Sequence, residues 1–138
     1  MEKIVNVWFE PDRIYIRTDA DEIYSRPLEA FPILKDASCA QREEFTIELG
    51  GEALRWASID EDIHITSFYD KTEPEYDNEV ARIFKKFPQL NVSEVARNMG
   101  INKSLLSKYI YGIKKPSDQR VSQIKAALRS LGQELAAV

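Results

Sequence analysis

The chain has 138 residues, of which 43% are hydrophobic and 30% are charged, a composition typical of a soluble globular protein. It holds no apolar run near the roughly 18 residues that span a bilayer and no signal-peptide pattern, so we expect a cytoplasmic protein without a membrane segment. The one cysteine, Cys39, excludes an internal disulfide, and with the one histidine, His64, it excludes an ordinary Cys/His zinc site.

The net charge of −4 conceals a division along the chain. Residues 1–75 contain 8 Lys and Arg against 18 Asp and Glu, whereas residues 76–138 contain 11 against 5. A basic surface gains affinity for nucleic acid by releasing counterions from the phosphates, whereas an acidic surface is repelled. The asymmetry predicts two domains with different roles, over residues 1–72 and 76–138.

Three short segments near the N-terminus have the β-branched and aromatic composition of strands. They are residues 4–9, 13–18 and 22–26. Pro11 and Asp12 favour a turn between the first two, so we predict a meander. Such a sheet needs a cover for its apolar face, and residues 27–40, with apolar side chains at roughly helical spacing around Pro32, are predicted to supply it.

A second pair of strands is predicted on either side of Gly50-Gly51, which is a hairpin signal. These strands are residues 44–49 and 52–56. An apolar segment at residues 65–69 follows, and its pattern does not distinguish a strand from a helix. Trp8, Trp56 and Cys39 are expected in the core. We therefore expect a small α+β domain, with an antiparallel sheet and short helices, up to a polar linker at residues 70–75.

The second domain reads as entirely helical. A first helix is expected to begin near Asp77 or Asn78 and to end before Pro88. Its expected buried stripe is Val80, Ile83, Phe84 and Phe87. Ser117 is a good N-cap for a last helix that we expect to end at Gly132. The residues of that helix spaced to face a core are Val121, Ile124, Leu128 and Leu131.

The stretch from Asn91 to Pro116 separates these helices and has the pattern of a helix-turn-helix. Ala96 is small enough for a second helix to cross closely, and Gly100 suits the left-handed residue that ends a helix. Asn102 is a good N-cap for the next helix, over residues 103–111. That helix is expected to keep Leu106 and Tyr109 inward.

This arrangement resembles the Cro/CI-type, lambda-repressor-like helix-turn-helix family over roughly residues 77–131. The resembling residues are Val95-Ala96, Met99-Gly100-Ile101-Asn102, Ser107-Lys108-Tyr109-Ile110 and Gly112-Ile113-Lys114-Lys115-Pro116-Ser117. The resemblance implies that the helix of residues 103–111 reads the DNA major groove. It departs at Val92, where the family usually has a polar residue that contacts phosphate, and Asn91 or Ser93 would have to serve instead.

The expected DNA contacts fall into two groups. Base edges are assigned to the residues expected to face outward, which are Lys103, Ser104, Ser107 and Lys108. Phosphate contacts are assigned to the residues around both helix ends, which are Asn91, Ser93, Asn102, Tyr111, Lys114 and Lys115. The alternative to DNA contact for all of these residues is an ordinary solvent-exposed helix surface.

The first domain resembles a small bacterial family of unknown function that often precedes a helix-turn-helix. The resembling residues are 31–37, 45–47, Gly50-Gly51, 54–56 and 59–63. No reaction is implied by this resemblance. The acidic run Asp60-Glu61-Asp62 reads as a solvated turn rather than a cation site, and His64 has no partner pattern for catalysis.

The leading hypothesis is therefore a sequence-specific DNA-binding transcriptional regulator, not an enzyme, with neither cofactor nor metal. A homodimer is expected, because useful affinity usually needs two half-sites. The acidic domain would supply dimerisation or bind a protein partner, as in an antitoxin-like repressor. The alternative is a protein-interaction module whose helix-turn-helix serves dimerisation or partner binding rather than DNA.

Overall fold

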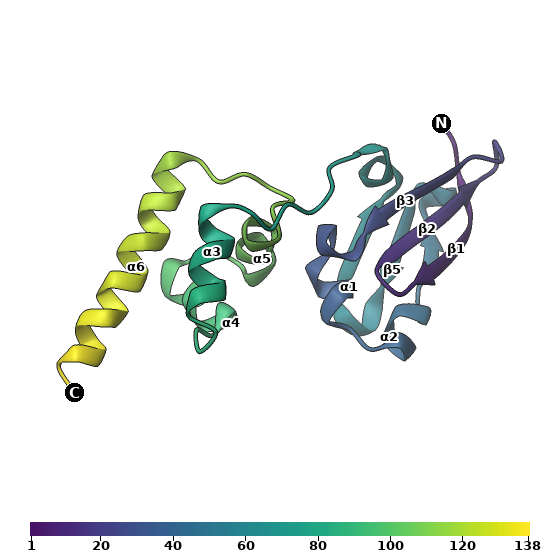
Figure 1. Cartoon of the computed structure of the whole chain (residues 1–138). Coiled ribbons are helices and arrows are strands. Elements are labelled where there is room, and N and C mark those ends of the chain that lie inside the picture. The colour runs from purple at the N-terminus through teal and green to yellow at the C-terminus, as the bar shows by residue number, and fades with distance from the viewer. The chain divides into compact units, whose positions relative to one another are not determined.

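The computed structural model describes all 138 residues and divides the chain into two compact units, Met1–Glu73 and Pro74–Val138 (Figure 1). We call them the sheet unit and the helical unit. The sheet unit holds two small antiparallel sheets with short helices, and the helical unit holds four helices, so the chain is α+β. None of the helices combines the length and apolar character that crossing a membrane requires.

The first sheet of the sheet unit confirms the predicted meander. Its three antiparallel strands, in the order β1-β2-β3, are β1 (Ile4–Glu10), β2 (Arg13–Thr18) and β3 (Ile23–Pro27). Glu10 pairs with Arg13 across the turn. Ile14 and Ile16 of the central strand are fully buried, because successive side chains of a strand point to opposite faces and these two share the inner one.

The second sheet has the order β4-β5-β6, and its strands are β4 (Thr46–Glu48), β5 (Ala53–Trp56) and β6 (Glu61–His64). The first of these strands is shorter than predicted. Leu49 already has a positive φ of 51°, and Leu49–Gly51 forms the 3₁₀ helix η2 in place of a two-residue hairpin. The apolar segment whose secondary structure the sequence left undecided, Ile65–Tyr69, is the 3₁₀ helix η4.

Short helices and both sheets share one core in the sheet unit. The remaining helices of this unit are η1 (Leu28–Ala30), α1 (Pro32–Asp36), α2 (Cys39–Glu43) and η3 (Ala57–Ile59). Leu34, Leu54 and Trp56 are fully buried in that core. The indole N–H of Trp56 donates to the carbonyl of Arg42 at 2.9 Å, which removes the cost of burying that polar group.

Two expectations about this core are wrong. Trp8 is only half-buried and stacks on Tyr15, with ring centroids 5.5 Å apart. It is paired with Tyr15 across β1 and β2, on the face away from Ile14 and Ile16. Cys39 is exposed, because it opens α2, a helix of one turn that buries none of its residues.

The helical unit consists of α3 (Glu79–Lys86), α4 (Val92–Met99), α5 (Lys103–Tyr111) and α6 (Asp118–Ala136). Each helix begins at a residue whose side-chain oxygen accepts from a backbone N–H of the first turn. These N-caps are Asn78, Asn91, Asn102 and Ser117. Such caps stabilise a helix end by about 1 kcal/mol each, so polar residues set where all four helices start.

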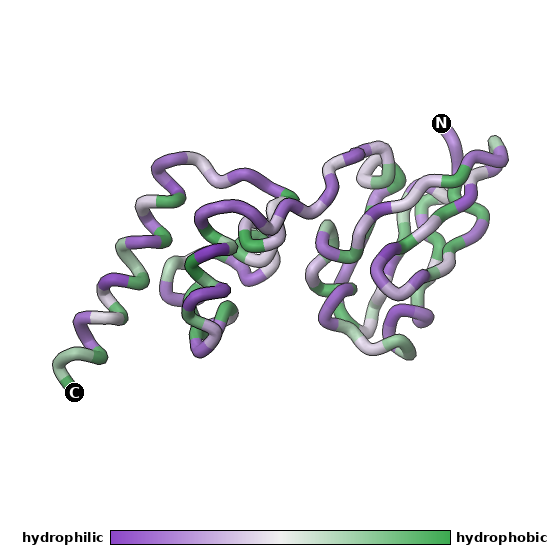
Figure 2. The backbone as a smooth tube through the Cα atoms, viewed as in Figure 1, coloured by the Kyte–Doolittle hydropathy of each residue, from purple (hydrophilic) through white to green (hydrophobic).

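Two boundaries in this unit differ from expectation. Phe87 follows the last residue of α3 in a non-helical conformation and is 49% exposed, so it does not continue the buried stripe of Val80 and Phe84. Gly132 does not end α6, which continues to Ala136. Figure 2 shows hydrophobic residues recurring along α6 as far as its C-terminal end.

Candidate nucleic-acid interface

The turn between α4 and α5 is built by backbone geometry at Gly100. Gly100 has φ +72°, its N–H donates to the carbonyl of Arg97 at 3.1 Å, and the N–H of Ile101 donates to that of Ala96 at 3.0 Å. This pair of bonds ends α4 and satisfies two of its last carbonyls. Ala96 is 1% exposed. The chain then enters α5 through Asn102, whose Oδ1 accepts from the N–H of Leu105 at 2.7 Å.

The C-terminus of α5 repeats this arrangement at Gly112, which has φ +74°. The N–H of Gly112 donates to Tyr109 O at 3.2 Å, and the N–H of Ile113 donates to Lys108 O at 3.0 Å. A second constraint is added by Glu75, since a Cβ at Gly112 would lie 2.0 Å from its carbonyl oxygen. The Glu75 N–H also donates to the carbonyl of Tyr111 at 2.9 Å. The chain before α3 therefore holds the end of α5.

Three of the four residues assigned to base edges reach the surface of α5. Lys103 is exposed, whereas Ser104 and Lys108 are half-buried. The fourth assignment needs a correction, because Ser107 is only 5% exposed. Both α3 and α4 pack against α5, so its buried face is wide enough to include Ser107 beside the predicted Leu106.

The residues assigned to phosphate contact lie around the same helix. Lys114 and Lys115 are exposed in the loop after α5. The exposed Asn91 and Asn102 use their Oδ1 atoms as caps, which leaves the side-chain NH₂ groups as donors. The remaining two assigned residues, both half-buried, are Ser93 and Tyr111.

Two side chains beside these positions are held by the fold. The ring of Tyr111 contacts Tyr76 edge-on, with centroids 6.2 Å apart. Val92, where the resembling family has a polar residue, packs against the core. The ring of Tyr111 is thus oriented by Tyr76. At the start of α4, the polar side chains are those of Asn91 and Ser93.

The cations of the helical unit fall into two sets. Those of α3, α4 and α6 include three that are paired with carboxylates. These salt bridges are Arg82 with Asp77 at 2.8 Å, Arg97 with Glu94 at 3.2 Å, and Lys125 with Glu79. Lys108, Lys114 and Lys115 form no salt bridge, and they lie in a stretch, residues 95–117, that contains no Asp or Glu. Around α5 and the loop that follows it, the sequence therefore supplies positive charge without an acidic neighbour along the chain.

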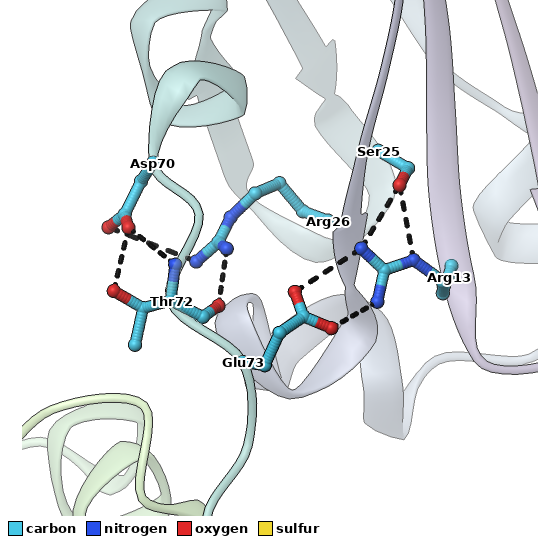
Figure 3. Close-up of polar contacts among 6 residues, drawn as sticks. All are labelled: Arg13, Ser25, Arg26, Asp70, Thr72 and Glu73. Atoms are coloured by element: carbon cyan, nitrogen blue, oxygen red, sulfur yellow. Dashed lines mark hydrogen bonds and ion pairs between the residues drawn. The ribbon is translucent and has the colours of Figure 1, made fainter.

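A different polar cluster in the sheet unit was not foreseen from the sequence (Figure 3). The guanidinium of Arg13 donates to Glu73 Oε1 at 2.5 Å and, through Nε and Nη2, to the hydroxyl of Ser25 at 3.1 and 3.0 Å. The hydrogen bond to Glu73 raises the pKa of Arg13. The end of the sheet unit is thereby fastened to β2 and β3.

Arg26 holds the same segment from a buried position. It is 2% exposed, its Nη1 donates to the carbonyl of Thr72 at 2.5 Å, and its Nη2 lies 3.9 Å from Asp70. Its Nε is buried without a hydrogen-bond partner. Burial lowers the pKa of Arg26, opposed by the charge of Asp70. Residues 70–73, predicted as linker, therefore belong to the sheet unit; no local sequence pattern signals a contact so distant along the chain.

Several other acidic side chains of the sheet unit also make structural contacts. Arg55 bridges Asp60 at 2.9 Å and Asp62 at 2.8 Å. Glu2 accepts from the hydroxyl of Tyr24 at 2.9 Å, and this bond raises the pKa of Tyr24 to about 12. His64 caps η4 by accepting from the N–H of Thr66. No group of three or more His, Cys, Asp or Glu side chains is placed to hold a metal ion.

Comparison with known proteins identifies the family of the sheet unit. Residues 4–74 match the family described as protein of unknown function (DUF2442). The match spans half of the chain, so the chain belongs to this family. It stops before α3 and does not include the helices around α5. Neither a curated protein nor a solved structure matches the chain.

Proposed function

We propose that the protein is a sequence-specific DNA-binding transcription regulator whose helical unit places α5 in the major groove. The observation that carries the proposal is a run of 23 residues, 95–117, with five Lys and Arg and no Asp or Glu. The run contains α5 and both of its flanking turns. A positive surface of this kind attracts the phosphate backbone.

Supporting geometry comes from the turn at Gly100 and the cap at Asn102. They present the first turn of α5, with the exposed Lys103, at an open end of the helix. In a helix-turn-helix, the N-terminal residues of the second helix contact base edges. We therefore assign base contacts to Lys103, Ser104 and Lys108. Ser107 is buried and is not among them.

Selection of bound duplexes from a random pool tests sequence specificity, and titrations at several salt concentrations test the phosphate contacts. Lys103→Ala and Lys108→Ala should weaken binding and alter sequence preference. Lys114→Ala should weaken binding to all sequences alike and reduce the salt slope by about one. Lys85→Ala, which removes the same charge from α3, is the matched control and should leave both properties nearly unchanged.

Two results would contradict the proposal. One is the absence of any duplex binding at low salt, which would favour the alternative of a protein-interaction module. The other is an equal effect of all four Lys→Ala variants on every sequence, because general electrostatic attraction alone would then account for binding.

A further inference from the structure

An open apolar groove lies under the second half of α6, within the helical unit. It has a volume of about 1090 Å³. One wall is formed by Ile83, Phe87 and Leu90, and the other by Leu128, Leu131 and Leu135 of α6. The first half of α6 is packed, with Ile124 fully buried, but Leu135 is 65% exposed. The apolar stripe of α6 thus continues to Leu135, beyond the part of the helix that is buried in the core.

The size of the groove matches a short length of helix. Two turns of α-helix, about eight residues, are roughly 12 Å long and 10 Å across, a volume of roughly 900 Å³. The apolar stripe of α6, from Leu128 to Leu135, is itself eight residues long. The chain therefore carries both a groove for an apolar helix and a helix segment of the matching length.

Gly132 supplies an independent observation. It lies inside α6, has no positive φ, and an added Cβ would meet nothing within 4 Å. A glycine inside a helix costs about 1 kcal/mol relative to alanine, and neither the turn geometry nor the packing of this chain requires it here. Glycine in such a position allows another backbone to approach closely. Gly132 also lines the groove. A backbone that approaches Gly132 would therefore lie in the groove.

We propose that the occupant is the α6 of a second copy of this chain, crossing antiparallel with its midpoint between Leu131 and Gly132. This register places Leu128 against Leu135 of the second copy, and Leu131 against Gly132 of the second copy. Each contact occurs twice, as a two-fold symmetric interface requires. The large side chain of Leu131 then faces the position where a side chain is absent. The same face, exposed on one copy, is covered on both copies of the dimer.

This inference does not depend on DNA binding, and it is tested without DNA. Sedimentation of the full chain should show a dimer with a Kd on the order of 10 µM, as for a small interface. Gly132→Leu and Leu135→Asp should each raise the dimer Kd at least about tenfold, because each change acts twice. Ser130→Leu, on the outward face of the same helix, is the matched control and should leave the dimer Kd unchanged.

Gly132→Leu also separates the interface from simple damage to the fold. Leucine favours helix over glycine, and a Cβ added at Gly132 meets no atom within 4 Å. The free energy of unfolding of the monomer should therefore rise while dimerisation weakens. A fall in both quantities would mean that Gly132 serves the monomer, which would overturn the proposal.

Disulfide trapping tests the register. In a Cys39→Ser background, a mixture of Leu128→Cys and Leu135→Cys chains should form a mixed disulfide on oxidation, whereas neither variant alone should cross-link. In this register, residue 128 of one copy lies about 10 Å along the helix from residue 128 of the other copy, because seven residues separate positions 128 and 135. The same holds for residue 135, and a disulfide cannot bridge that distance. A chain that stays monomeric at high concentration, self-cross-linking of either variant alone, or a dimer that all these variants leave intact would each overturn the proposal.

Discussion

The arginines of the sheet unit and the lysines that follow α5 lie in opposite surroundings. In the sheet unit, the guanidinium groups of Arg13, Arg26 and Arg55 are turned onto carboxylates or a carbonyl of the unit itself. In the helical unit, Lys114 and Lys115 project from a stretch that has no acidic residue to meet them. The three arginines therefore hold the sheet unit together, whereas Lys114 and Lys115 are exposed to solvent.

The largest test of this division removes the core of one unit. Trp56→Ala should destabilise the sheet unit by about 3–5 kcal/mol, because it empties a fully buried site and removes the bond to Arg42. The helical unit should keep its structure and the proposed duplex binding, as followed by urea unfolding with circular dichroism and by DNA titration. Trp8→Ala, at a half-buried stacked position, should cost roughly 1 kcal/mol. Joint loss of both units in Trp56→Ala would show that they do not fold separately.

A matched pair of glycine substitutions tests the helical unit alone. Gly100→Ala and Gly112→Ala both force alanine into a left-handed conformation, which costs about 1–2 kcal/mol. Only Gly112 also meets the backbone of Glu75, and that overlap should add about 1–3 kcal/mol. Urea unfolding followed at 222 nm measures both. Equal losses would mean that Glu75 moves aside without cost.

Arg26 tests whether the sheet unit needs the charge or only the side-chain stem. Arg26→Ala should destabilise the sheet unit by about 1–3 kcal/mol, because it loses buried packing and the bond to Thr72. Arg26→Met keeps much of the stem and removes the cost of burying a charge, so the loss should be within about 1 kcal/mol. Thermal unfolding distinguishes the two outcomes. A methionine variant as unstable as the alanine variant would show that the guanidinium itself is needed.

The smallest expected effect concerns acid sensitivity of the helical unit. The hydrogen bond and charge of Lys125 lower the pKa of Glu79. A lowered folded-state pKa adds stability above the ordinary carboxyl pKa of about 4.3, and this contribution is lost as the pH falls through the folded pKa. Glu79→Gln should therefore slightly reduce stability at pH 7 and flatten its fall toward pH 3. Glu134→Gln, which breaks no salt bridge, is the control, and an identical pH profile for both variants would contradict the assignment.

Local signals in the sequence predicted much of the secondary structure. The strands of the first sheet follow from alternation, and three helix starts follow from Asn78, Asn102 and Ser117, which act within a few residues of their own position. Asn91, which was predicted only as a phosphate contact, caps α4 in the same way. The turn at Gly100 was predictable for the same reason, since a left-handed residue between two helices favours glycine.

What the sequence did not predict depends on contacts between distant elements. Ser107 has the spacing of an outward residue on a two-faced helix, but α5 is covered by two neighbours. Phe87 fits the periodicity of α3, yet the helix has already ended at Lys86. The bond from Arg26 to Thr72 joins residues 46 positions apart, so no window of sequence could reveal it. The DNA contacts themselves stay predictions.

The bond from Glu75 to the carbonyl of Tyr111 means that the helical unit starts before its first helix. A fragment cut at Asn78 would keep all four helices but would leave the last turn of α5 uncovered at Gly112. Fraying there would loosen the loop that carries Lys114 and Lys115. An isolated helical fragment used to test the proposed DNA binding therefore has to begin at Pro74, because a shorter fragment would lack the bond that holds the end of α5.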